Sequence, residues 1–167
     1  MTHPLPDEDL LLALLNSTPV VDGSQRDMLT GRDAGTWLRE YGDADSSVEQ
    51  TRRARALLQD VVRGTVGAAS LTPMLAGVRS VPQIDAETLA WTIRTPPGKK
   101  VAVRAILAWA ELQRLHPGRL RACANDDCAL FLIDHSKPNR ARWCSMAVCG
   151  NRMKARRHYA RTRSAGE

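Results

Sequence analysis

The chain has no apolar run close to the roughly 20 residues that a membrane-spanning helix needs. The apolar stretch Leu10–Leu15 is far shorter. It follows the acidic segment Asp7–Asp9, whereas a secretory signal carries basic residues before its apolar core. These absences argue against a membrane span and a signal peptide, so we expect a cytoplasmic protein with no membrane partner.

Aromatic residues and enzyme motifs are also scarce. The sequence holds four Trp, two Tyr and one Phe, 4% of its residues. RNA-binding modules that stack bases on aromatic side chains need more of these platforms. No phosphate-binding glycine loop, H-E-x-x-H motif or G-x-S-x-G motif occurs. We therefore expect no enzymatic activity.

Acidic residues are rare in the last part of the chain. Residues 119–167 contain eleven Lys and Arg but only four Asp and Glu, a formal charge of +7, whereas residues 1–118 carry −1. A basic segment of this kind favours an anionic partner such as nucleic acid.

Cysteine is absent outside one segment, which contains four cysteines spaced C-x4-C-x15-C-x4-C: Cys123, Cys128, Cys144 and Cys149. Two close pairs separated by the length of a hairpin can place four thiolates around one Zn²⁺. Disulfides in any of three pairings, or four unlinked core cysteines, are the alternatives. A reducing compartment opposes the disulfides. The spacing predicts one structural zinc ion, because four thiolates leave no coordination position for a substrate.

The apolar pattern predicts a predominantly α fold with a minor β component (α+β). Helices are expected at residues 7–16, 33–41, 47–63 and 99–115, with a short one within 70–78. The β-branched and aromatic segment Thr88–Arg94 predicts a strand, with residues 81–84 as its partner. Residues 22–32 are polar and turn-like.

Residues 1–118 are expected to form this helical domain with its short β-hairpin. Residues 119–167 are expected to form the zinc module, with the boundary near 117–121 and no independent linker. The predicted module is treble-clef-like: a knuckle, a hairpin of residues 129–133 with 141–143, and a C-terminal helix starting near Ser145. The place of His135 in a polar loop favours a solvated side chain.

The predicted C-terminal helix is basic over most of its surface, with Met153 and Ala160 as a narrow apolar stripe. Cations that repel one another along a helix favour docking on an anion. The alternative is a solvated basic tail. The candidate nucleic-acid contacts are basic residues of this segment: Arg140, Arg142, Arg152, Lys154, Arg156, Arg157, Arg161 and Arg163.

The segments Arg121–Cys128 and Trp143–Arg152 strongly resemble the CGNR zinc-finger family, which is named for the tetrapeptide found here at Cys149–Arg152. The resemblance covers about residues 118–163. The preceding helical part resembles the ABATE domain that usually comes before this finger, at Leu14–Thr18 and in the helix with Trp37 and Leu38. The resemblance implies a bacterial, stress-induced transcription regulator with a DNA-binding zinc finger.

By position, the resemblance makes the four cysteines the zinc ligands. It implies that Gly150 lets the backbone approach the sulfurs closely. Asn151 would hydrogen-bond a thiolate or the knuckle backbone, or contact a base. Arg152 would offset the charge of the site or grip phosphate, and Trp143 would pack over the module or stack on a base.

DNA binding is the leading hypothesis for the function, with RNA binding or a protein-interaction module as alternatives. One unpaired finger reads few base pairs, so a homodimer through residues 1–118 is a further expectation. A small-molecule effector of the helical part is another, and it rests on analogy with the fold alone.

Overall fold

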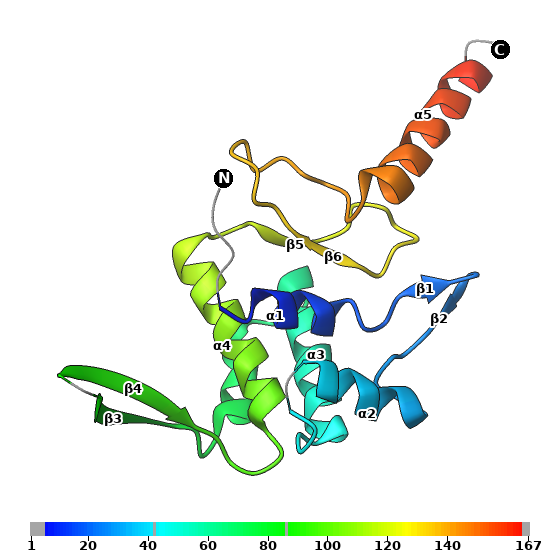
Figure 1. Ribbon diagram of the computed structural model, residues 1–167. Coiled ribbons are helices and arrows are strands. Elements are labelled where there is room, and N and C mark those ends of the chain that lie inside the picture. Colours follow the sequence, from blue (N-terminus) through cyan, green and yellow to red (C-terminus); the bar gives the residue numbers. More distant parts are fainter. Residues whose placement is uncertain (1–5, 42, 86, 165–167) are drawn as a thin grey trace.

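The structure is a computed structural model that describes residues 6–41, 43–85 and 87–164 (Figure 1). Helices dominate this part of the chain. Its α-helices are α1 (Glu8–Leu15), α2 (Gly31–Glu40), α3 (Val48–Arg63), α4 (Lys100–Leu115) and α5 (Asn151–Ser164). Two helices of other types are the 3-10 helix η1 (Ala68–Leu75) and the π-helical turn η2 (Met146–Gly150).

The strands of the described residues form three separate antiparallel pairs. They are β1 (Val20–Val21) with β2 (Ser24–Gln25), β3 (Arg79–Asp85) with β4 (Thr88–Arg94), and β5 (Leu120–Ala122) with β6 (Phe131–Ile133). The predicted hairpin of residues 81–84 with 88–94 is confirmed. The segment 22–32, expected to be turn-like, contains β2 and the beginning of α2.

Local signals explain where the predicted helices begin and end. Ser47 caps α3, because its hydroxyl accepts a hydrogen bond from the backbone N–H of Gln50 at 3.3 Å. Gly64 ends the same helix with a φ of 77°, a conformation that glycine adopts without steric cost. The expected short helix within residues 70–78 starts earlier, at Ala68, and is a 3-10 helix.

The core lies between α1, α3 and α4. Leu11, Leu14, Leu58 and Leu112 are fully buried there. Leu120 and Phe131, which flank the predicted zinc knuckle, belong to the same buried cluster. The zinc module therefore packs directly on the helical core, and the two share one hydrophobic interior.

Polar contacts strengthen this junction. The Asn16 side chain donates to the Phe131 carbonyl at 3.2 Å and accepts from the Phe131 N–H at 2.7 Å. The Arg63 guanidinium lies 4.6 Å from the centre of the Phe131 ring. His135, expected to be solvated, is instead half-buried with its Nε2 2.5 Å from Oε1 of the buried Glu8. That expectation was wrong because the loop folds back onto α1.

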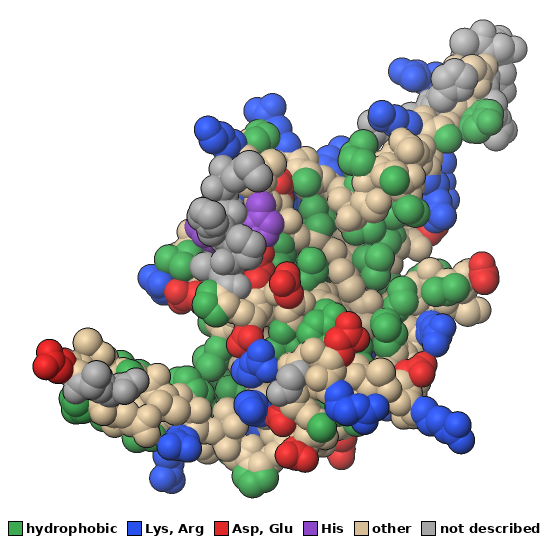
Figure 2. Space-filling model, in the orientation of Figure 1, with side chains coloured by type: hydrophobic (Ala, Val, Ile, Leu, Met, Phe, Trp, Pro, Cys, Tyr) green, Lys and Arg blue, Asp and Glu red, His purple; other side chains and the backbone are tan. Residues whose placement is uncertain are grey.

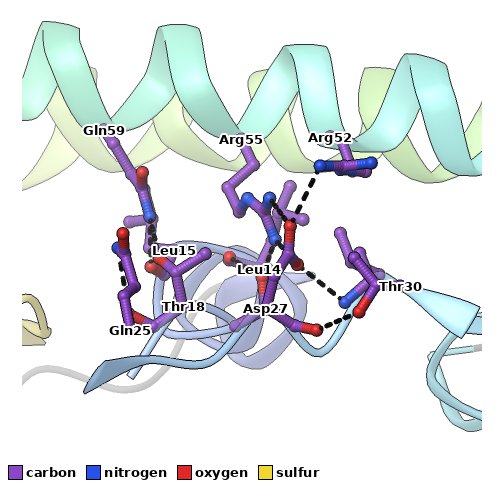
Figure 3. Close-up of polar contacts among 11 residues, drawn as sticks. Leu14, Leu15, Thr18, Gln25, Asp27, Thr30, Arg52, Arg55 and Gln59 are labelled. Atoms are coloured by element: carbon purple, nitrogen blue, oxygen red, sulfur yellow. Dashed lines mark hydrogen bonds and ion pairs between the residues drawn. The ribbon is translucent and has the colours of Figure 1, made fainter. Parts of the chain in front are cut away.

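A second polar network fixes the segment after α1 against α3 (Figure 3). The buried Arg55 donates to both Asp27 carboxylate oxygens at 2.6 and 2.8 Å and to the Ser17 hydroxyl at 2.9 Å. Gln59 donates to the Thr18 hydroxyl at 3.0 Å. The hydrogen bond from Arg55 is the main reason that the pKa of Asp27 lies below its usual value, although partial burial opposes the shift.

None of the helices in the described part of the chain is both long enough and apolar enough to cross a bilayer.

Candidate metal centre

Four cysteine sulfurs converge at the junction of the β5–β6 hairpin and the C-terminal helix. Their Sγ atoms all lie within 4.8 Å of one another, and none of the cysteines forms a disulfide. Cys144 Sγ is 3.7 Å from Cys128 Sγ and 3.6 Å from Cys149 Sγ. A tetrahedral Zn²⁺ with bonds of about 2.3 Å separates its sulfurs by about 3.8 Å. The donor set and its spacing therefore fit one zinc ion.

The first cysteine pair sits where the β5–β6 hairpin turns. The backbone N–H of Cys123 donates to the Leu130 carbonyl at 2.8 Å, which extends the hairpin ladder to the first ligand. The N–H of Cys128 donates to the Asn125 carbonyl at 2.8 Å and tightens the turn between the two ligands. This turn presents both sulfurs on the same side.

The second pair flanks η2. Ser145 caps this turn, since its hydroxyl accepts from the Val148 N–H at 3.4 Å. Cys149 lies near the end of η2, and α5 begins two residues later at Asn151. The prediction of a helix beginning near Ser145 and carrying the last ligand in its first turn is confirmed.

The predicted pairing within the hairpin was wrong. Residues 129–133 were expected to pair with 141–143, but β6 pairs with β5 and residues 141–143 form no strand. The buried Asp134 explains the difference. Its carboxylate accepts from the backbone N–H groups of Ser136 at 2.9 Å and Ala141 at 2.8 Å, so the loop closes on Asp134 and does not form a second ladder.

Burial and hydrogen bonding shift the pKa values of Cys128, Cys144 and Cys149. Burial and the neighbouring thiols raise the pKa of Cys144, and burial also raises the pKa of Cys128. Burial alone would raise the pKa of Cys149 as well, but hydrogen bonds from Asn125 and the other cysteines lower it overall. Such a cluster resists becoming four thiolates unless a cation neutralises it, which Zn²⁺ does when bound.

Two asparagines support the second cysteine pair. Asn125, 1% exposed, donates to Cys149 Sγ at 3.5 Å, whereas the sequence of its segment predicts only a turn. Asn151 is exposed and donates to the Ala147 carbonyl of η2 at 3.2 Å, which is neither a thiolate nor the knuckle backbone that was expected. An asparagine between two cysteines can form a turn or hydrogen-bond a sulfur, and the sequence does not show which. The contact of Asn125 with Cys149 was therefore not predicted.

Gly150 is closely surrounded by side chains of the module. A Cβ at this position would lie 2.8 Å from the end of the Met146 side chain and 3.3 Å from Cδ1 of Trp143. A side chain at this position would therefore force Met146 to move, and the expected close approach of the Gly150 backbone to the sulfurs stays a prediction. Trp143 is half-buried beside it, with the Arg142 guanidinium 5.3 Å from the ring centre.

The expected nucleic-acid contacts fall into two groups. Arg140 and Arg142 lie in the loop before Cys144, and the others lie on α5, which makes its main contacts with η2 and extends away from the body (Figure 1). The described side chains among them are exposed: Arg140, Arg142, Arg152, Lys154, Arg156 and Arg161. The side chains of Arg157 and Arg163 lie outside the described part.

The side of α5 nearest the knuckle is partly neutralised. Arg156 forms an ion pair with Asp127, and both side chains are about half-exposed. Arg152 lines an open groove of about 1080 Å³ that runs between the β1–β2 hairpin and the zinc module. Asp126 and Asp127 line it too, so this groove presents charges of both signs.

Comparison with known families decides the nature of this module. Residues 119–162 match the family described as the CGNR zinc finger. Residues 119–162 are a CGNR zinc finger. The four cysteines are its single zinc site, which confirms the predicted cofactor. No curated protein matches the chain. The ABATE likeness of the preceding helical part stays a prediction.

Proposed function

We propose that the protein is a DNA-binding transcription regulator whose CGNR zinc finger presents α5 to the duplex. The supporting observation is that the charged side chains of α5 are all basic and that this helix directly follows a zinc ligand. Residues 151–164 contain six Lys and Arg and no Asp or Glu. Because Cys149 is a zinc ligand and α5 follows it directly, zinc binding fixes where this cationic helix starts and in which direction it runs.

The ion pair on α5 suggests which side meets the phosphates. Arg152 and Arg156 are four residues apart and face the acidic knuckle. Lys154 and Arg161 are seven residues apart, so they share a different face. We place the duplex on the Lys154 and Arg161 face, away from the knuckle acids. The 14 residues of α5 span about 21 Å at 1.5 Å per residue, long enough to lie across a major groove.

Duplex DNA fits this surface better than single-stranded RNA. Recognition of unpaired bases relies on stacking against aromatic side chains. The whole chain has seven aromatic residues, and those of the zinc finger include the half-buried Trp143 and the exposed Tyr159. Six arginines and lysines on one helix instead suit contacts with phosphates and with guanine edges.

The test replaces Lys154 with Glu in the zinc-loaded full chain and measures binding to duplex DNA at several salt concentrations. The wild-type affinity is expected to fall steeply with salt. Lys154→Glu should weaken binding to all sequences by roughly tenfold and lower the salt slope by about one. Arg53→Glu is the matched control, because it makes the same charge change on an exposed position of α3.

Equal losses in the two variants would mean that net charge, and not α5, drives binding. No loss in Lys154→Glu would remove this face of α5 from the interface. If structured RNA competes for the protein more strongly than duplex DNA does, the proposal that duplex DNA is the ligand is contradicted. Binding to an acidic protein that persists after nuclease treatment, without DNA binding, would support the protein-interaction alternative.

A further inference from the structure

The β3–β4 hairpin has one apolar and one polar face. Its register places Pro82 opposite Trp91 and Ile84 opposite Leu89, so these side chains share a face with Ile93. On the other face, the Thr92 hydroxyl donates to the Gln83 side chain at 2.8 Å. Strand alternation of this kind is typical of a sheet with one packed face and one solvated face.

The apolar face of the hairpin is nevertheless exposed. Ile84 is 74% exposed and Trp91 61%, with Leu89 and Ile93 also exposed. The two strands make their main contacts with each other, and the hairpin projects as an arm at the side of the helical body away from the zinc finger (Figure 1). An isolated two-stranded hairpin is marginally stable in water. A partner that covers the apolar face would therefore stabilise the arm.

An apolar cleft continues the apolar face of the arm at its base. Ile93 lines this cleft of about 440 Å³ together with Val103, Leu107 and Ala108 of α4. The arm and the cleft thus form one continuous apolar surface. Each molecule therefore has a projecting apolar hairpin and a cleft in which the hairpin of a second copy can bind. Self-complementary surfaces of this kind allow a closed twofold dimer.

The charges along the arm also match a second arm that runs in the opposite direction. The tip of the hairpin carries the exposed Glu87, and hydrophobic side chains line the arm behind this acidic tip (Figure 2). At the base, Arg79 and Arg94 lie on the polar face, but the exposed Lys100 lines the α4 cleft that continues the apolar face. Other charged residues of this cleft are paired within the molecule, Asp7 with Arg104 and Glu111 with Arg114. The acidic tip of an antiparallel second arm would bring Glu87 to Lys100 at both ends.

We propose that the β3–β4 arm is a homodimerisation device. Two copies pack their arms antiparallel, apolar face to apolar face, and the acidic tip of each arm lies at the α4 cleft and Lys100 of the other. Pro82 favours facial packing over extension of the sheet at β3, because proline has no N–H to donate to another strand. The dimer does not depend on DNA binding, but it would give the protein two fingers for two half-sites.

The size of the surface is sufficient. Ile84, Leu89, Trp91 and Ile93 together expose on the order of 500 Å² per copy, so pairing hides roughly 1,000 Å² before the clefts are counted. A specific interface needs about 1,000 Å² in total.

The test measures the mass of the zinc-loaded full chain by light scattering and sedimentation in the absence of nucleic acid. Wild type should be a dimer. Ile84→Glu should raise the dissociation constant by at least about tenfold, because it places a charge within the apolar face. Gln83→Glu adds the same charge one residue away on the polar face and should leave the dimer intact. Far-UV circular dichroism and zinc content check that each variant is folded.

A charge exchange tests the orientation of the arms. Glu87→Arg should weaken the dimer, and adding Lys100→Glu should restore it. A monomeric wild type, a dimer unaffected by Ile84→Glu, or a failure of the double variant to recover would each overturn the proposal. Because no DNA is present, these outcomes are independent of the proposed function.

Discussion

At the scale of single residues, Asn16 stands out because one side chain satisfies two backbone groups of another element. It binds both the N–H and the carbonyl of Phe131, 115 residues away. We predict that Asn16→Ala lowers the free energy of unfolding of the zinc-loaded protein by about 2 kcal/mol, since the buried Phe131 loses its side-chain partner for both groups.

Urea unfolding of the zinc-loaded protein measures this change. Asn151→Ala is the control, because it removes an exposed amide with one backbone contact and should cost less than about 0.5 kcal/mol. Similar losses in the two variants would show that Asn16 has no special role at the junction.

Asp27 makes stability depend on pH. Its pKa in the folded state lies below the ordinary 3.8, mainly through the hydrogen bond from Arg55. The carboxylate therefore stabilises the fold above that value, and its contribution disappears as the pH falls through the folded pKa. Asp27→Asn should cost roughly 2 kcal/mol at pH 7, where it leaves the buried Arg55 without its counter-ion.

The measurement is the difference in unfolding free energy between wild type and Asp27→Asn, followed from neutral to acidic pH. Zinc release in acid affects both proteins and cancels in the difference. The difference should shrink towards zero at acidic pH. A constant difference across the range would mean that the charge of Asp27 contributes nothing to stability.

The cysteine ligands of the zinc ion could be predicted from the sequence, whereas the side chains that hydrogen-bond those cysteines could not. The cysteine spacing limits how a chain can surround a metal, so Cys123, Cys128, Cys144 and Cys149 were identifiable from their positions alone. The contact of Asn125 with Cys149 depends on how the turn between two ligands folds. Nothing in the local sequence separates it from an ordinary turn residue.

At the scale of helices and strands, periodic patterns predicted the helices and the β3–β4 hairpin, but the strand pairing within the finger was predicted wrongly. The helices at 47–63 and 99–115 have regular apolar spacing, and α3 and α4 match them closely. The predicted pairing of the finger hairpin was wrong because several short segments could have paired with residues 131–133. Packing of Leu120 and Phe131 into the helical core selects β5 as the partner, and that contact is invisible in the local sequence.

Strand β6 is therefore the element that joins the finger to the helices. We predict that Phe131→Ala lowers the free energy of unfolding by about 3 to 5 kcal/mol, because it leaves a cavity in the shared core and removes the ring beneath Arg63. The helical signal and zinc release should shift together in the denaturant titration. Leu115→Ala, at an exposed position of α4, is the control and should change little.

If Phe131→Ala promotes zinc release at lower denaturant while the helical transition stays unchanged, finger and helices are energetically separate. The shared core argues against that result.

At the scale of the whole molecule, charge and apolar surface are segregated. The cationic α5 projects on one side of the body, and the apolar β3–β4 arm projects on another (Figure 1). The charge asymmetry was visible in the sequence. The exposure of the arm was not, because an alternating strand predicts a buried face without saying whether this chain or another copy covers it.

The proposed DNA binding requires a zinc ion that sets the direction of the arginine-rich helix α5, and its most direct test is the DNA affinity with and without that ion. Duplex binding is measured at one low salt concentration for the zinc-loaded chain, for the chain stripped by a chelator under reducing conditions, and after zinc is restored. We predict that stripping weakens binding by at least about tenfold and that zinc restores it, because metal binding and folding of the finger are coupled. Equal affinity with and without zinc would contradict the account.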